Sequence, residues 1–282
     1  ANSLSLAQLC QPFHAVVCHE NAHIQTDECA APEFFSGGAK LLGLAGAQGK
    51  LHAEAIGAAL AKRNDVHSSK PRVISVTQST ELGTVYLPNE LNEIAEVARA
   101  HELFLQMDGA RFANAVATLE CAPKEITWQL GVDVLSFGGT KNGLGAGELV
   151  VFFNKELAGE FDYRVKQGAQ LPSKMRFLAA PWSALLRDDV WLGNARRANA
   201  SAQALARKLH EAAWLEPVFP VQANALFVRL PDALVDELHA RGWHFYKFVE
   251  PDIHRLMCSW ATQEEAIAEF VAEMKALTSA AP

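Results

Sequence analysis

The chain has 282 residues, half of them apolar and a fifth charged, which is typical of a globular protein and excludes a disordered or fibrous one. It has 25 Lys and Arg against 32 Asp and Glu, so its net charge is −7. Nucleic-acid binding requires clustered basic side chains, and no dense basic run occurs, so we expect no nucleic-acid partner. No apolar stretch reaches the roughly 18 residues of a membrane-spanning helix, so we expect no membrane contact.

The cysteines indicate the compartment. There are five, an odd number, widely spaced and without a C-x-x-C pair. This pattern disfavours a disulfide framework or a thiolate zinc site and is typical of a reducing compartment. The first residues, Ala1–Leu6, lack the basic segment of a signal peptide. We therefore expect a cytoplasmic protein.

Strand-like and helix-like segments alternate through the first part of the chain. The predicted strands are Ala15–Cys18, Arg72–Thr77, Leu103–Asp108, Val132–Phe137 and Leu149–Phe153. The segments of helical period between them are Glu90–His101, Phe112–Leu119 and Pro123–Leu130. Several of these strands lack period-two alternation, as expected when both faces of a sheet are covered. The sequence therefore predicts an α/β fold with a mostly parallel sheet sandwiched by helices.

The pattern changes after Pro181. Ser183–Ala213 is predicted as one long helix, rich in Ala and Arg. It is followed by a strand, a helix, a strand and a helix, at Ala225–Leu230, Asp232–Arg241, Arg255–Trp260 and Gln263–Leu277. We predict two domains: a large one over residues 1–190, and a linking helix with a smaller α+β domain over 191–282.

A Gly-rich segment with a single lysine, Ser136–Gly143, follows a predicted buried strand. A lysine at the end of a strand can form an imine with a carbonyl group if its pKa is lowered. The segment is not a phosphate-binding Walker loop, because Asn142 stands where that motif requires Ser or Thr. Taken alone, the pattern around Lys141 favours an exposed lysine of a turn over a catalytic one.

Asp108 lies in the segment Met107–Arg111, which follows the apolar run Leu103–Leu105. The carboxyl end of a parallel strand is where open α/β sheets bind their ligands. The alternative is that Asp108 caps the helix beginning near Arg111.

His19–His23 (HENAH) matches the H-E-x-x-H pattern of zinc hydrolases. That chemistry needs both imidazoles on one face of a helix, whereas strand-like residues run directly into this motif. Thr26 and Cys29 also stand where the longer form of the pattern has Gly and His. We interpret the match as coincidental and keep a zinc hydrolase as an alternative hypothesis.

Two further positions could carry chemistry, with a solvated surface role as the alternative for each. Glu81 lies among the hydroxyl side chains that follow a predicted strand, and Arg255 enters a strand of the smaller domain. An arginine there could bind a carboxylate through two parallel hydrogen bonds.

A lysine and an aspartate at neighbouring strand ends, with a loop histidine and a remote arginine, match the needs of pyridoxal phosphate. That cofactor requires an amine for its aldehyde and a carboxylate for its pyridine nitrogen.

The whole chain resembles the low-specificity L-threonine aldolases, of the β-eliminating lyase group of fold-type-I pyridoxal-phosphate enzymes. The segments that carry the resemblance are Cys18–His23, Ala31–Lys40, Gln78–Val85, Met107–Asn114, Asp133–Asn142, Ser173–Phe177 and the strand with Arg255. The resemblance implies a fold-type-I architecture and pyridoxal-phosphate-dependent cleavage of L-threonine or L-allo-threonine to glycine and an aldehyde. It also implies a homodimer or homotetramer with sites at the subunit interface.

The resemblance assigns individual residues. It implies that Lys141 is the Schiff-base lysine, that Asp108 pairs with the pyridine nitrogen, and that His23 stacks on the cofactor ring, which replaces the zinc interpretation. The other implied contacts are Arg111 and Thr140 at the cofactor, Arg176 near its phosphate or a neighbouring subunit, and Arg255 at the substrate carboxylate. The catalytic base stays open between Glu81, His23 and a bound water, since Glu81 stands where some relatives have a histidine.

Family members begin with several dozen further residues that end in a phosphate-binding Gly-Thr pair. The first residue of this sequence, Ala1, corresponds to a position just beyond that pair. We therefore also consider a truncated, non-catalytic fragment. The remaining alternatives are a phenylserine aldolase and a β-eliminating lyase of the same cofactor class.

Overall fold

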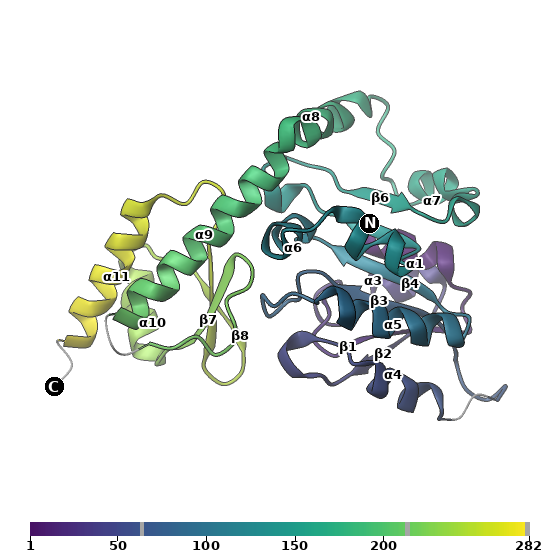
Figure 1. Cartoon of the computed structure of the whole chain (residues 1–282), viewed down its shortest axis with the longest axis horizontal. Coiled ribbons are helices and arrows are strands. Elements are labelled where there is room, and N and C mark those ends of the chain that lie inside the picture. Colours follow the sequence, from purple (N-terminus) through teal and green to yellow (C-terminus); the bar gives the residue numbers. More distant parts are fainter. Residues whose placement is uncertain (63–64, 212–214, 280–282) are drawn as a thin grey trace.

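One sheet of six strands and one of three organise the chain in the computed structural model, which describes residues 1–62, 65–211 and 215–279 (Figure 1). The larger sheet has the order β2-β1-β3-β4-β5-β6. Its strands are His14–His19 (β1), Lys40–Leu44 (β2), Lys70–Thr77 (β3), Phe104–Gly109 (β4), Val134–Phe137 (β5) and Leu149–Phe152 (β6). Strands β1 to β5 pair in parallel and β6 is antiparallel to β5, which confirms the predicted mostly parallel sheet.

Helices cover both faces of this sheet (Figure 1). They are α1 (Asn2–Leu9), α2 (His23–Thr26), α3 (Ala31–Ser36), α4 (Ala53–Leu60), α5 (Pro88–Ala100), α6 (Phe112–Leu119), α7 (Phe161–Gln167) and α8 (Arg176–Leu186). Successive residues of an inner strand point to opposite faces. Ile74 belongs to the apolar cluster that includes α5 and α6, while Val73 belongs to the cluster that includes α1. The apolar runs of the sequence are thus buried from both sides.

The smaller sheet is antiparallel, with the order β7-β9-β8. Its strands are Ala225–Arg229 (β7), Tyr246–Val249 (β8) and Ile253–Met257 (β9), and the helices near it are α9 (Val190–Glu211), α10 (Asp232–Ala240) and α11 (Glu264–Ser279). These elements share an apolar cluster of their own, which includes Leu209, Leu226 and Phe270. Helix α9 runs from α8, beside the larger sheet, down along the smaller domain (Figure 1). The division between residues 190 and 191 stays a prediction.

Paired amides attach α9 to the larger sheet. The Asn114 side chain of α6 donates to Asn199 Oδ1 at 2.8 Å, and Asn199 donates back to the Asn114 carbonyl at 3.0 Å. Asn142 donates to the Trp191 carbonyl at 3.0 Å, and Asn194 donates to the Asn142 carbonyl at 2.9 Å. Because these amides are largely buried and mutually satisfied, they fix one relative position of helix and sheet.

Two predicted helices are wrong. Ser183–Ala213 is not continuous: α8 ends at Leu186 and α9 begins at Val190, because Asp188 and Asp189 have φ values of 54° and 55°. Residue 213 lies outside the described residues. The segment Pro123–Leu130 forms two 3₁₀ turns, since Thr127 between them leaves the helical region at φ −130° and ψ −110°.

The sequence prediction also missed or displaced several short elements. Strand β9 spans Ile253–Met257 where Arg255–Trp260 was predicted. The helices and strands without a prediction are α1, α2, α3, α4, α7, β2 and β8. Four to eight residues carry too few periodic positions to distinguish a strand from a helix.

Among the described residues, no helix combines the length and apolar character needed to cross a membrane.

Two glycines carry the chain from β5 into the turn that holds Lys141, Thr140–Asn142 (η4). A Cβ atom at Gly138 would lie 2.6 Å from the Ala110 Cα, and one at Gly139 would lie 2.6 Å from the Trp182 ring. Such separations are too short for carbon atoms. Gly138 therefore lets the loops after β4 and β5 approach each other closely, and Gly139 lets the loop after β5 pack against Trp182 of α8.

We expect Gly138→Ala to lower the free energy of unfolding by about 1–3 kcal/mol, because the atoms it would meet are backbone atoms of Ala110. Chemical denaturation measures the loss. Gly145→Ala is the matched control, since a Cβ there meets no atom within 4 Å among the described residues. Equal effects of the two substitutions would contradict the role of close approach.

Candidate active site

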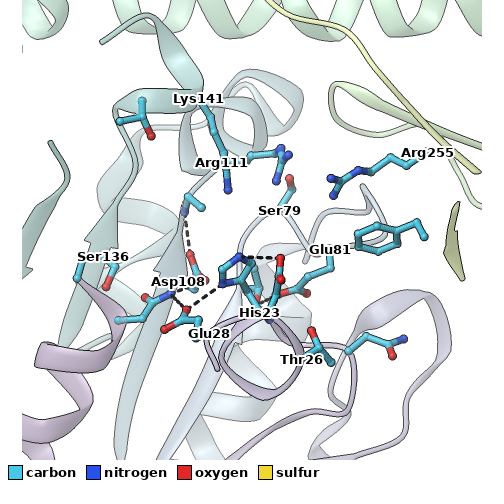
Figure 2. A pocket seen from close by; sticks show the side chains of 18 of the residues that line it. His23, Thr26, Glu28, Ser79, Glu81, Asp108, Arg111, Ser136, Lys141 and Arg255 are labelled. Carbon is cyan, nitrogen blue, oxygen red and sulfur yellow. Dashed lines mark hydrogen bonds and ion pairs between the residues drawn. The ribbon is translucent and has the colours of Figure 1, made fainter. Parts of the chain in front are cut away.

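The carboxyl ends of four parallel strands lie at one edge of the larger sheet, beside a cavity of about 850 Å³. His23 follows β1, Glu81 follows β3, Asp108 lies near the end of β4 and Lys141 follows β5. Arg255 reaches the same cavity from β9 of the smaller sheet. Figure 2 shows these side chains directed into one space. Parallel pairing thus gathers residues that are far apart in the sequence.

Asp108 is the most enclosed acid of the site, with 3% of its surface exposed. It pairs in register with Thr77 of β3 and Ser136 of β5. Its Oδ1 accepts the Ala110 N–H at 2.9 Å, and its Oδ2 accepts the Asn2 side-chain amide at 2.7 Å. The carboxylate does not cap α6, because Arg111 is the residue at that position. Two donors therefore fix the direction in which Asp108 faces the cavity.

Lys141 lines the cavity from the turn after β5. Partial burial lowers the pKa of its amine, and the positive charge of Arg111 lowers it further, while Asp108 and Glu148 act in the opposite direction. A lowered pKa makes the uncharged, nucleophilic form of a lysine more accessible. Its surroundings are therefore those of a reactive amine.

Glu81 has an incompletely paired carboxylate. Its Oε1 accepts the His23 backbone N–H and the Thr77 hydroxyl, both at 2.8 Å. Its Oε2 is buried and has no hydrogen-bond partner in the described part of the chain. Burial, together with the negative charge of Asp108, raises the pKa of Glu81 to about 7. Near neutral pH this carboxyl group can therefore both accept and release a proton.

Two guanidinium groups face the same space. Burial lowers the pKa of Arg111, although Glu81 and Asp108 partly compensate for it. Burial, and then the charge of Arg111, lower the pKa of Arg255 to about 10. The Nε atoms of both arginines are buried without a hydrogen-bond partner among the residues described. Uncompensated donors beside a cavity favour an anionic ligand.

Aromatic rings support Arg255. Its guanidinium carbon lies 4.3 Å from the ring centre of Phe248 and 4.8 Å from that of Tyr246. Both rings come from β8, which pairs with β9. Contact with ring faces stabilises a cation that has lost water and restricts the plane of the guanidinium.

The other predicted site residues differ in their positions. Thr140 lines the cavity, and its hydroxyl donates to Glu148 at 2.5 Å. Arg176 begins α8, is exposed, stacks over Phe177 at 5.1 Å and does not line this cavity.

The zinc-hydrolase hypothesis fails on geometry. His19 ends β1 and His23 begins α2, so the two imidazoles do not share one face of a helix. His19 Nε2 lies 3.0 Å from the Gly46 carbonyl, and its Nδ1 accepts the Asn21 N–H at 3.0 Å. Within the described ranges, no three His, Cys, Asp or Glu side chains are grouped to hold a metal ion.

Among the residues that line the cavity, sequence reasoning did not single out Asn2, Glu28, Ser79, Tyr246 or Phe248. Asn2 and Glu28 belong to none of the motifs, and Ser79 lies within the segment Gln78–Val85. Tyr246 and Phe248 are two residues apart in a strand and therefore share a face. This spacing of two aromatic residues could have indicated, from the sequence, an aromatic support for Arg255.

The comparisons decide the family, because the model of the β-eliminating lyases matches residues 1–232. The chain belongs to the β-eliminating lyase family. It is 50% identical over 280 residues to a low specificity L-threonine aldolase of Pseudomonas sp. (strain NCIMB 10558), covering 99% of this chain and 81% of that protein.

Solved structures agree with this assignment. A threonine aldolase of Leishmania major superimposes with a TM-score of 0.91 and 29% identity, covering 98% of this chain and 81% of that one. A serine palmitoyltransferase of Sphingomonas wittichii shares the fold, with a TM-score of 0.70 and 15% identity over 99% of this chain and 70% of that one. The predicted family and fold-type-I architecture are confirmed.

Proposed function

We propose that this β-eliminating lyase family member cleaves L-threonine and L-allo-threonine to glycine and acetaldehyde, with pyridoxal phosphate as its cofactor. The observation that carries the proposal is that Asp108 of β4, Lys141 of the turn after β5 and Arg255 of β9 line one cavity. The 50% identity to a low specificity L-threonine aldolase supports the same substrate class.

The donors and acceptors of the cavity fit pyridoxal phosphate. Lys141 would bind its aldehyde carbon, Asp108 its pyridine nitrogen, and the half-buried His23 ring its flat face. Ser79 Oγ and Arg111 Nε are buried without partners in the described residues, so they are free to bind the oxygen atoms of an anion. When bound, the cofactor supplies an electron sink for the carbanion left by bond cleavage.

Arg255 would bind the α-carboxylate of the substrate. Two parallel hydrogen bonds from a guanidinium fix both the position and the plane of a carboxylate. Phe248 and Tyr246 restrict the plane of the guanidinium, so the bound carboxylate would be restricted as well. The substrate would then be held at one rotation about the bond between its α-carbon and its amine nitrogen. That rotation decides which bond of the α-carbon is aligned for cleavage.

We propose Glu81 as the acceptor of the substrate hydroxyl proton. Its buried Oε2 atom has no partner in the described part of the chain, and its pKa of about 7 suits a base at neutral pH. His23 or a bound water would take this role if Glu81 does not.

We expect Lys141→Ala to reduce threonine turnover by at least about a thousandfold, because the variant lacks the amine that would bind the cofactor aldehyde. With added pyridoxal phosphate, the parent protein should show a yellow absorbance band that borohydride bleaches, and the variant should not. The exposed Lys155 gives a control, Lys155→Ala, that should behave as the parent does. Normal turnover by Lys141→Ala would refute the lysine assignment.

We expect kcat/KM for threonine to rise as pH increases through about 7, because Glu81 must lose its proton before it can accept another. Glu81→Gln should lose this inflection and about 10²- to 10⁴-fold in rate. A pH–rate profile that matches the parent's would exclude Glu81 and leave His23 or water as the base.

The released product distinguishes the rival activities. Threonine cleavage yields acetaldehyde and glycine, a phenylserine aldolase would prefer benzaldehyde release from phenylserine, and a β-eliminating lyase would release ammonia. Rates on threonine and phenylserine, with assays for aldehyde and for ammonia, therefore test the proposed reaction directly.

We also propose a homodimer or homotetramer, located in the cytoplasm. Apolar side chains in and beside α8 are exposed, including Leu171, Met175 and Phe177, and exposed apolar clusters favour contact with another subunit. We expect Phe177→Glu to produce smaller species in analytical ultracentrifugation, and Val66→Glu, at a fully exposed position, to leave the assembly unchanged. Identical sedimentation of both variants and parent would remove this face from the interface.

A further inference from the structure

The carboxamide of Asn2 bridges two carboxylates at the cavity. Its Nδ2 atom, which has two hydrogens, lies 3.1 Å from Glu28 Oε1 and 2.7 Å from Asp108 Oδ2. Its Oδ1 accepts the Gln106 side-chain N–H at 3.3 Å. The opposite orientation would place the amide oxygen against two anions, so the chemistry of the neighbours fixes the amide as found.

Glu28 connects this bridge to the imidazole of His23. Its Oε1 lies 3.0 Å from His23 Nδ1, and its Oε2 accepts the Ser3 hydroxyl at 3.1 Å. Burial raises the pKa of Glu28, but the hydrogen bonds from His23, Asn2 and Ser3 outweigh it, and the pKa is lowered. The carboxylate therefore stays ionised although only 14% of its side chain is exposed.

The charged groups around His23 come from several elements. Glu28 raises the pKa of His23 through its hydrogen bond, against burial, while Asp108 raises it further and Lys141 lowers it. Asp27 Oδ2 lies 3.4 Å from Nε2, but 80% of its side chain is exposed, so solvent screens that contact. Glu81 contacts only the backbone N–H of His23 by hydrogen bond. Glu28 is thus the dominant partner of the ring.

We propose that Glu28 and Asn2 are positioning residues of this site: Glu28 holds the His23 ring through Nδ1, and Asn2 joins that carboxylate to Asp108. The inference rests on the proposed function only in placing His23 and Asp108 against the cofactor. The hydrogen-bonded chain His23–Glu28–Asn2–Asp108 sets the position of the ring relative to the acid, so the group that would stack on the cofactor and the group that would bind its pyridine nitrogen form one unit. It also keeps the imidazole protonated to higher pH.

The test uses two substitutions in the 282-residue chain, each of which removes a different contact. Glu28→Gln keeps the shape and removes the charge beside His23. Asn2→Leu keeps the approximate size and removes both donated hydrogen bonds, with Asn2→Ala as a second variant if Leu prevents folding. Glu90→Gln is the matched control, since Glu90 is a partly buried carboxylate paired with Lys50 away from the cavity.

Two measurements separate positioning from a general loss of structure. The first is the NMR titration midpoint of His23, assigned from the signal that His23→Asn lacks and recorded with and without pyridoxal phosphate. The second is the dissociation constant of pyridoxal phosphate from its absorbance titration. Thermal melting shows whether each variant is folded under the conditions of both measurements.

The two variants should respond in different measurements. We expect the His23 midpoint to fall in Glu28→Gln and to change less in Asn2→Leu, where the carboxylate remains. We expect Asn2→Leu to weaken cofactor binding about tenfold, because Asp108 loses its Oδ2 donor. Glu90→Gln should change neither value.

Each assignment can fail by itself. A His23 midpoint that does not move in folded Glu28→Gln overturns the role of Glu28, and an unchanged cofactor affinity in folded Asn2→Leu or Asn2→Ala overturns the role of Asn2. If both values move as expected but the parent protein does not cleave threonine, the positioning chain stands and the proposed reaction falls.

Discussion

The parallel pairing of β3, β4 and β5 is the constraint on which the site depends. In register, Thr77 stands beside Asp108 and Asp108 beside Ser136. A parallel sheet places every carboxyl strand end at the same edge, so each loop that follows adds one side chain to a common space. A shift of one residue in β4 would turn Asp108 to the opposite face of the sheet. The backbone register of the sheet therefore decides which side chains face the cavity.

The charges at this edge counterbalance one another incompletely. Asp108 and Glu81 are enclosed acids, while Arg111 and Arg255 are largely buried bases. Asp108 is satisfied by two donors, whereas Glu81 Oε2 and both guanidinium Nε atoms have no partner within the described residues. Buried polar atoms without partners reduce folding stability, and they persist where a ligand completes them. The unpaired atoms thus mark where substrate and cofactor groups would bind.

Much of the large sheet and the outline of the site could be predicted from the sequence, because both have strong local signals. Apolar runs marked β3, β4 and β5. Asp108 lies near the end of β4, and Lys141 lies in the turn that follows β5. Glu28 and Asn2 could not be found this way, since their roles arise from contacts between residues 26 and 106 positions apart. The break between α8 and α9 could not be predicted either. Asp188 and Asp189 adopt a left-handed conformation there, and no glycine at these positions indicates it in the sequence.

Helix α9 gives the two halves of the cavity a common reference. The turn that carries Lys141 is hydrogen-bonded to α9 through Asn142 and Asn194, and α9 also packs in the apolar cluster that includes β7 and β9. Arg255 lies on β9, so the positions of its guanidinium and of the Lys141 amine both depend on the same helix. Because the turn and the small sheet both pack on one helix, the position of the amine is tied to that of the guanidinium. The separation of these two groups decides whether one amino acid can span both of them.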